Sequence, residues 1–534
     1  MLAGLLERIN PKRIFWCAAG LLAIPAIVAE FRVPLNADAA WLAYAADSVL
    51  RGRKLYTDIL EINPPLIVWL NLPAALMHRI TGVSGPLAFR LFVLVVLGAS
   101  ILACVRLSRQ LRGPAIILRA RLLTLSLLFV LLPLVAGIFG QREHLALALI
   151  LPFVVLVALR VQRQPVSRMH ALAVGTAAAV GFSLKPHFLA VWLLLLGYRM
   201  WHGGKEGPRL LVEDGGVVVT GILYLLAVVA ITPGYFGFAH GAARDYLVFG
   251  QHRLADILLG DTPAIWLYIA VLSWYILGVP GREGGLGGPL VAAGLGFVMA
   301  VGLQHKGWSY HYYPVTASAV LLGICTVASA TGSRNFSRIW QRVALRAVLG
   351  IFGALLGLFA TKTLIDTARR AAGELSERQV TQLKLRAVVG SLHGARSILI
   401  LSSQLRDAFP LVNDTHLEWN GTFPVLWVPL VRYRSYAGPS ERTAYRSPDQ
   451  MDPVEQLAFR RVVSDFILRP PDVLVVESRA LNERRTRFPG GFDYCSYFGQ
   501  DPHFASRLRE YLPLGDVGGL LILRRENTSA PSRI

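Results

Sequence analysis

Apolar segments of about 20 residues recur along the first two-thirds of the chain, with arginine-rich connections between them. A helix needs roughly 20 mainly apolar residues to cross the hydrocarbon core of a bilayer, and by that criterion we expect about twelve spans. They centre on residues 14–30, 64–80, 88–106, 118–137, 145–160, 171–184, 188–200, 215–232, 263–280, 287–303, 312–330 and 346–362. The chain is therefore predicted to be a polytopic α-helical membrane protein with about 12–13 transmembrane helices.

The basic residues fit this prediction better than they fit a nucleic-acid partner. The 54 Lys and Arg residues against 33 Asp and Glu residues give a net charge of +21. They concentrate in alternate connections, as the positive-inside rule predicts for cytoplasmic loops of a membrane protein. The segments Arg106–Arg121, Arg160–Arg168 and Arg334–Arg346 are thus expected in the cytoplasm of a bacterial cell, together with the N-terminus. Membrane lipids are the expected surroundings, and no nucleic acid is expected.

One part of this topology is inconsistent. Two full crossings between residues 64 and 106 would place the segment Arg106–Arg121 on the outer side, where its arginines are disfavoured. Either one of these helices is re-entrant, or the chain has a further short span that the hydrophobic pattern does not reveal.

The composition changes after Lys362. Helix-like segments at 377–392, 453–468 and 502–511 alternate with short apolar, strand-like segments at 397–402, 472–477 and 519–523. This alternation predicts a small soluble α/β domain. We expect a transmembrane module over residues 1–365 and a periplasmic α/β domain over residues 366–534.

Acidic residues at predicted membrane boundaries are the first candidates for chemistry, because charge is costly there unless it is used or hydrated. Asp38 begins a helix-like segment in the first outer loop, and Glu61 stands shortly before Pro64 and Pro65. A structural alternative is that Asp38 caps that helix, as Asp often does, and that Glu61 pairs with a nearby Arg53 or Lys54.

Taken together, the acids belong to a longer pattern. Its parts are Asp38, Gly52-Arg-Lys-Leu-Tyr-Thr-Asp58, Glu61-Ile-Asn-Pro-Pro-Leu66, Arg90, Gly140-Gln-Arg-Glu-His144 and Leu184-Lys-Pro-His-Phe188. This pattern resembles the GT-C fold glycosyltransferases that use polyprenyl-phosphate sugars, among them the protein O-mannosyltransferases and the lipid A aminoarabinose transferases. The resemblance covers residues 14–200 well and residues 201–362 in general architecture. Glu143 stands where an Asp is more common in that family.

The resemblance implies a fold, an activity and a set of roles. A sugar would pass, with inversion, from a polyprenyl-phosphate donor to an envelope lipid, glycan or protein at the outer face of the bacterial inner membrane. Asp38 would be the general base that takes the proton of the acceptor hydroxyl. Glu61 and Glu143 would orient the acceptor or hold a divalent cation near the phosphate. Two carboxylates without a tight motif do not establish that cation.

The anionic donor requires positive charge on the outer side. Only seven of the 54 basic residues are lysines, and two of these, Lys185 and Lys306, fall in short connections predicted to face outward. Because the positive-inside trend disfavours them there, we expect them to contact the donor phosphate. Further candidates for donor contact are Arg53, Arg142 and His187.

Lys306 lies in the segment Gln304–Pro314, which is dense in aromatic residues and histidine. An interfacial aromatic belt would explain the aromatic rings, but it would not explain the neighbouring basic residues. We therefore expect Tyr310 and His311 to contact the donor headgroup or sugar. A zinc site is not expected, because the histidines lack a standard ligand spacing.

Two other functional hypotheses remain open. A transporter or flippase of lipid-linked sugars would also have about twelve spans with charges inside them. It would place ionisable residues near the middle of its spans, whereas here they cluster at one face. An inactive relative that binds an envelope partner would retain its cellular role after substitution of Asp38.

Overall fold

The structure is a computed structural model that describes residues 10–111, 116–202, 210–238, 241, 251–260, 262–276, 285–331, 339–433, 445–478 and 491–526. Contacts divide the chain into two compact units, and each unit is made of three segments that alternate along the sequence with those of the other. The helical unit consists of Met1–Val33, Arg90–Ala227 and Gln251–Glu374. The α/β unit consists of Pro34–Phe89, Val228–Gly250 and Leu375–Ile534.

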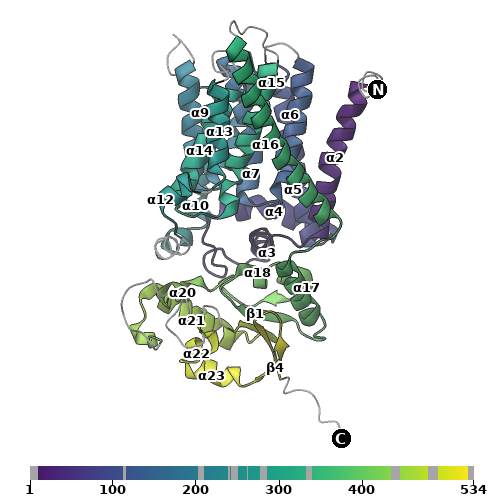
Figure 1. The fold of residues 1–534 in the computed structure, drawn as a ribbon. Helices are drawn as coiled ribbons and strands as arrows, with labels where there is room; N and C mark the ends of the chain where they lie inside the picture. Colours follow the sequence, from purple (N-terminus) through teal and green to yellow (C-terminus); the bar gives the residue numbers. More distant parts are fainter. Residues whose placement is uncertain are drawn as a thin grey trace. The chain divides into compact units, whose positions relative to one another are not determined.

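The helical unit is a bundle of apolar helices (Figure 1). They are α2 (Pro11–Arg32), α5 (Gly85–Ser108), α6 (Ile116–Leu131), α7 (Arg142–Val161), α8 (Arg168–Ser183), α9 (Leu189–His202), α10 (Val212–Ile231), α12 (Leu254–Leu259), α13 (Ala264–Ile276), α14 (Gly287–Gln304), α15 (Tyr313–Thr331) and α16 (Ile339–Ala371). The 3-10 turns η1 (Pro133–Val135), η2 (Pro186–Phe188) and η5 (Ser309–Tyr312) interrupt the connections. Within the described residues, six helices are long and apolar enough to cross a membrane. The prediction of a polytopic helical membrane protein is confirmed.

Helix α7 is the core of the helical unit. Its residues from Arg142 to Leu159 are buried with the single exception of Leu149. It packs against α8, α9, α14 and α15. A helix that is apolar all round and buried all round is expected at the centre of a bundle. The first turn of α7 therefore carries its polar residues, beginning with Arg142 and Glu143, into a buried position.

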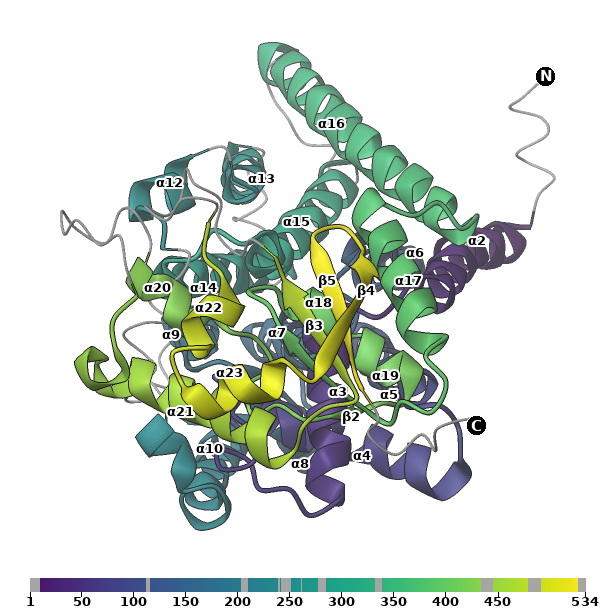
Figure 2. The ribbon, with the colours of Figure 1, turned by 90° about the horizontal axis from the view of Figure 1, so that it is seen from below.

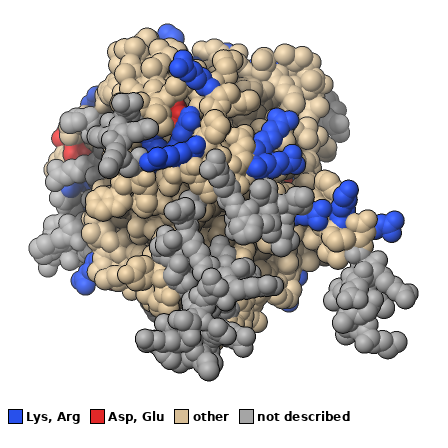
Figure 3. Space-filling model, turned by 90° about the horizontal axis from the view of Figure 1, so that it is seen from above, with Lys and Arg blue, Asp and Glu red and all other residues tan. Residues whose placement is uncertain are grey.

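One end of the bundle is basic. The described parts of the α5–α6 and α7–α8 connections carry several basic residues. Figure 3 views the molecule from that end and shows many Lys and Arg side chains and few acids. Exposed basic residues of these connections include Arg109, Arg163 and Arg168. This grouping is the pattern that the positive-inside rule predicts.

The inconsistency in the predicted topology arises from the segment at 64–80. This segment forms α4 (Leu66–Thr81), a helix of 16 residues that belongs to the α/β unit and packs on α3 (Ala37–Leu50). Because α4 groups with α3 and not with the helices of the helical unit, the structure favours the first of the two alternatives, in which one of the two helices is re-entrant.

Buried ion pairs join three helices near the basic end. Arg160 Nε lies 2.8 Å from Glu213 Oε1, and Arg199 Nη2 lies 2.5 Å from Asp214 Oδ2. The acids are on α10, whereas the arginines are on α7 and α9. Helices α8 and α10 approach closely there, because an added Cβ on Gly175 would lie 2.2 Å from the Glu213 carbonyl oxygen. Gly175 is thus required by the close approach of the two helices.

The α/β unit contains a five-stranded sheet of order β2-β1-β3-β5-β4. The strands are β1 (Ser397–Leu401), β2 (Glu418–Trp419), β3 (Val473–Glu477), β4 (Tyr511–Asp516) and β5 (Leu520–Arg525). Strand β1 pairs in parallel with β2 and β3, whereas β5 pairs antiparallel with β3 and β4. The short apolar strands β1 and β3 are buried, as expected for parallel strands covered on both faces.

Helices flank this sheet. They are α17 (Glu377–Gly390), α18 (Leu405–Ala408), α19 (Leu411–Thr415), α20 (Trp427–Tyr433), α21 (Pro453–Leu468), α22 (Tyr494–Phe498) and α23 (Pro502–Leu508), with the turn η6 (Pro448–Gln450). Helix α17 lies on one side of the strands and α21 to α23 on the other (Figure 2). The predicted alternation of three helices and three strands is confirmed in α17, β1, α21, β3, α23 and β5.

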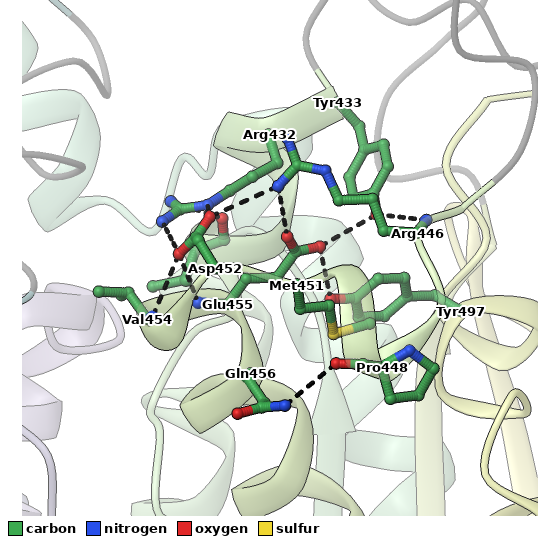
Figure 4. Close-up of polar contacts among 11 residues, drawn as sticks. Arg432, Tyr433, Arg446, Pro448, Met451, Asp452, Val454, Glu455, Gln456 and Tyr497 are labelled. Carbon is green, nitrogen blue, oxygen red and sulfur yellow. Dashed lines mark hydrogen bonds and ion pairs between the residues drawn. The ribbon is translucent and has the colours of Figure 1, made fainter.

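A buried ionic cluster fixes α20 against α21 (Figure 4). The carboxylate of Glu455, fully buried, accepts hydrogen bonds of 3.0 Å from the hydroxyls of Tyr433 and Tyr497. Arg432 donates two bonds to Asp452, of 2.9 and 2.8 Å. These arginine bonds hold the pKa of Asp452 at about 2, against the opposing effect of its partial burial. The cluster belongs to the packing of the α/β unit.

The close approach of α8 and α10 gives a first prediction. Gly175→Ala is expected to lower the free energy of unfolding by about 1–3 kcal/mol, because the new methyl group overlaps the α10 backbone. Gly197→Ala is the matched control, since nothing lies within 4 Å of a Cβ added there. Alanine is a better helix former than glycine, so the control is expected to be neutral or more stable. Thermal unfolding in detergent measures both, and equal midpoints would contradict the packing described here.

Candidate functional site

The first turn of α7 brings one carboxylate and several cations together inside the helical unit. Gly140, with φ of 74°, turns the chain immediately before the helix. Glu143 follows in the first turn and is 1% exposed. An anionic side chain is favoured there by the amide dipoles at a helix N-terminus. Its neighbours come from connections distant in sequence.

Lys185 is the direct partner of Glu143. Lys185 has an extended backbone conformation and connects α8 to η2. Its Nζ is 2.5 Å from Glu143 Oε1 and 2.7 Å from Gln304 Oε1. Gln304 is the last residue of α14, and its own amide nitrogen donates to the Ala300 carbonyl at 2.9 Å. The ammonium of Lys185 is thereby held between α7 and α14. The other carboxylate oxygen of Glu143, Oε2, is buried without a hydrogen-bond partner among the described residues.

Two further cations and a histidine surround this pair. His311 Nε2 lies 3.8 Å from Glu143 Oε1, and His311 Nδ1 lies 2.9 Å from the Lys306 carbonyl oxygen. Arg142 and Lys306 are 4% and 2% exposed. Burial first, and then the positive charges of Lys185 and Arg142, lower the pKa of Lys306 to about 7. We call Arg142, Glu143, Lys185, Lys306 and His311 the cation cluster.

The cation cluster gathers three cations around one carboxylate. Within the described part of the chain, Glu143 is the carboxylate whose charge acts on these groups, beside the cations Arg142, Lys185 and Lys306. Several cations brought together in a buried position favour an anionic ligand among them. His187, half-buried in η2, adds no charge near neutral pH: burial and the charge of Lys185 lower its pKa to about 4.

Aromatic rings border the cations. Lys306 Nζ lies 4.7 Å from the centre of the Trp308 ring, and Lys185 Nζ lies 5.7 Å from the centre of the Tyr310 ring. Both are cation–π distances. The following tyrosines, Tyr312 and Tyr313, are buried within the helical unit. An aromatic belt facing lipid therefore does not describe this segment as a whole.

Asp38 and Glu61 belong to the α/β unit. Asn36 caps α3, because its side chain accepts a 3.0 Å bond from the backbone N–H of Asp38. The alternative in which Asp38 is the cap is thus wrong. Asp38 is half-buried in the first turn of α3.

Glu61 is buried and fully engaged. One carboxylate oxygen accepts from the Trp41 indole, and the other accepts from the backbone and side-chain N–H groups of Asn63. Pairing of Glu61 with Arg53 or Lys54 does not occur. Arg53 instead donates to the Asp58 carbonyl at 2.9 Å, and the Lys54 backbone N–H donates to the Asp58 carboxylate at 2.8 Å. The shape of this turn thus comes from hydrogen bonds among nearby residues of the same segment.

These surroundings do not suit the divalent cation that the sequence left open. Ligand groups for such an ion are free oxygens, without competing positive charge nearby. Glu143 faces cations, and both oxygens of Glu61 accept from N–H groups. Within the described residues, no group of three or more His, Cys, Asp or Glu side chains is placed to hold a metal.

Sequence analysis did not single out Gln304, Trp41 or Asn63, which bind the predicted site residues directly. A polar residue at the end of an apolar helix was the available signal for Gln304. Trp41 and Asn63 gave no such signal, because an indole or an amide is common in any loop or helix.

Comparison with known proteins identifies the fold. No family model matches the sequence, and no curated protein does. Among solved structures, the chain is similar to ArnT from Cupriavidus metallidurans bound to undecaprenyl phosphate, with a TM-score of 0.56 and 13% identity over 97% of this chain and 98% of that one. A second similar structure is an Archaeoglobus fulgidus oligosaccharyltransferase in complex with Zn and sulfate. Its TM-score of 0.41, at 10% identity over 92% of this chain and 71% of that one, is too low to establish a shared fold.

The chain therefore has the GT-C fold, in a multi-pass membrane protein with a C-terminal α/β region. This confirms the fold class that the sequence predicted.

The pairing of Glu143 with Lys185 gives a second prediction. Glu143→Gln is expected to destabilise the helical unit by about 3–5 kcal/mol, because the buried ammonium loses its counter-charge. Glu374→Gln is the control: this acid is exposed and its ion pair with Arg369 is long, 3.8 Å, so its loss is expected to change little. Thermal unfolding in detergent measures both.

The double variant Glu143→Gln/Lys185→Met sharpens this test. Removing both partners is expected to be less harmful than removing the carboxylate alone. A double variant less stable than the single one would contradict the pairing.

Proposed function

We propose that this protein is a membrane glycosyltransferase that moves a sugar from a polyprenyl-phosphate donor to a lipid, glycan or protein acceptor of the cell envelope. The cation cluster is the single observation that carries the proposal. It places three cations, Arg142, Lys185 and Lys306, beside one another in a buried position, and cations of this kind bind the phosphate of a lipid-linked donor. The GT-C fold supports it, and ArnT from Cupriavidus metallidurans, a solved structure similar to this chain, was bound to undecaprenyl phosphate.

The reaction places different demands on the two ends of the donor. The acceptor hydroxyl attacks the anomeric carbon, its proton passes to Asp38, and the bond between that carbon and the phosphate oxygen breaks with inversion. Arg142, Lys185 and Lys306 stabilise the phosphate that departs as an anion. Side chains near these cations contact the donor headgroup or sugar; they are Tyr310, His311, Trp308 and His187. Arg53 is a further candidate for the phosphate.

Glu143 and Glu61 serve as positioning residues in this scheme. Glu143 fixes Lys185 through a direct ion pair, and Glu61 fixes the turn before Pro64 through Trp41 and Asn63. No step of this scheme is routed through a metal, because Glu143 lies among cations and both oxygens of Glu61 accept from N–H groups. This assignment differs from the acceptor- or metal-binding role expected from sequence.

The basic end of the helical unit supports an orientation in the membrane. We place that end, with the N-terminus, in the cytoplasm of a bacterial cell. Transfer then occurs at the outer face of the inner membrane, and residues 366–534 form a periplasmic domain. The transporter hypothesis differs in its product: it predicts movement of an intact lipid-linked sugar with no new glycosidic bond.

The catalytic assignment is tested by Asp38→Asn. Transfer of radiolabelled sugar from polyprenyl phosphate to envelope extract is expected to fall by about a hundredfold to ten-thousandfold, since the variant cannot accept the proton. Asp47→Asn is a matched control on the same helix, where Asp47 is partly exposed and bonds to Arg79 at 2.8 Å. Equal transfer by wild type and Asp38→Asn would sink the mechanism.

The phosphate assignment is tested by pH. Lys306 with its pKa near 7 is charged below that pH and neutral above it, so affinity for an anionic lipid declines as pH rises through 7. Undecaprenyl phosphate is expected to bind the wild type about tenfold more weakly at pH 8.5 than at pH 6, the scale of one hydrogen bond to a charged group. Lys306→Arg, which stays charged, is expected to flatten the profile. Parallel profiles for the two proteins would count against Lys306 as a phosphate ligand.

A further inference from the structure

The C-terminal part of the chain packs directly on helix α3, the helix whose first turn carries Asp38. Both belong to the α/β unit. Phe409, which follows α18, is completely buried. Its ring centre lies 5.1 Å from that of Trp41 and 5.5 Å from that of Tyr44 on α3, and 5.4 Å from that of Trp419 on β2. Aromatic pairs at such distances attract one another beyond their burial of apolar surface.

Hydrogen bonds between the two segments use backbone groups. Asn413 Nδ2 on α19 donates to the Ala40 carbonyl at 3.0 Å, and the Trp419 backbone N–H donates to the Tyr44 hydroxyl at 3.2 Å. Ala40 lies two residues after Asp38. Bonds to the main chain fix the position and rotation of a helix more closely than contacts between mobile side chains do.

The turn that follows α3 is fixed in the same way. The Leu60 backbone N–H donates to the Thr422 carbonyl at 3.0 Å, and the Thr422 N–H in turn donates to Asp465 of α21 at 2.7 Å. Glu61, the next residue, bonds back to Trp41. Hydrogen bonds therefore join the C-terminal region both to α3, which carries Asp38, and to the turn that precedes Glu61.

A general base must be held within a fraction of an ångström of its working position, and a displacement of about 1 Å can cost a hundredfold in rate. Helix α3 has only 14 residues, and isolated helices of that length are marginal in water. We propose that the C-terminal α/β domain positions α3, and with it the Asp38 carboxylate, through Phe409, Asn413 and Trp419. These are positioning residues, and the inference rests on the proposed function of Asp38.

The experiment compares two tyrosine hydroxyls in the α/β unit. Tyr44→Phe removes the acceptor of the Trp419 N–H. Tyr511→Phe is the matched control, because its hydroxyl also has one backbone partner, the Pro471 carbonyl at 2.7 Å, and lies on β4 rather than on α3. A third variant, Asn413→Ala, removes the bond to Ala40.

Hydrogen–deuterium exchange gives the structural readout. Peptides covering residues 37–50 are expected to exchange faster in Tyr44→Phe and Asn413→Ala than in the wild type, and to be unchanged in Tyr511→Phe. Exchange of α3 that is the same in all four proteins would overturn the inference. This readout needs neither donor nor acceptor.

Kinetics give the functional readout. Each α3 contact variant is expected to lower kcat for transfer about threefold to tenfold, the effect of one net hydrogen bond, with the donor KM within about twofold of wild type. A domain that only covers the protein or binds the acceptor would instead leave kcat unchanged or alter the acceptor KM, and either result would overturn the inference. A wild type that transfers no sugar would defeat the proposed function itself, while the exchange comparison still reports whether the domain holds α3.

Discussion

The ion pair between Lys185 and Glu143 is the interaction around which the polar interior of the helical unit is organised. A buried ammonium needs a counter-charge, and the first turn of α7 supplies one carboxylate for three neighbouring cations. Gln304 fixes the same ammonium from α14. The three cations thus lie close together in the interior, and this grouping connects the packing of the bundle with the proposed recognition of an anionic lipid.

Near the basic end of the same bundle, buried acids are paired with arginines. Arg199 is buried and Arg160 half-buried there, and they face two buried acids, Glu213 and Asp214. Because the two arginines are paired with two acids, these ion pairs hold the helices together and leave no excess charge for a ligand. The contrast explains why buried cations alone do not identify a site: the balance of charge around them does, and only neighbours brought together by the fold establish that balance.

In the segment that contains Asp38 and Glu61, a buried acid is satisfied by neutral hydrogen-bond donors and not by a cation. Glu61 accepts from Trp41 and Asn63, so it costs little to bury and holds the loop in one shape. The same loop is bonded to the C-terminal region through Ala40, Tyr44 and Leu60. The roles of its two acids are therefore distinct: Glu61 is enclosed, whereas Asp38 remains half-buried on a capped helix.

The sequence by itself determined the apolar helices, the basic end of the bundle and the alternating elements of the C-terminal region. These follow from local hydrophobic periodicity and charge patterns, which can be read from the sequence without knowing which segments contact one another. It also singled out Glu143, Lys185 and Lys306 as unusual charges in their settings. Only the tertiary structure decided that α4 joins α3 rather than the bundle, that Gln304 binds Lys185, and that Asn36 rather than Asp38 caps α3. Each depends on contacts between segments or on a choice between adjacent polar groups, and hydropathy and residue type carry no information about which partner a polar group finds.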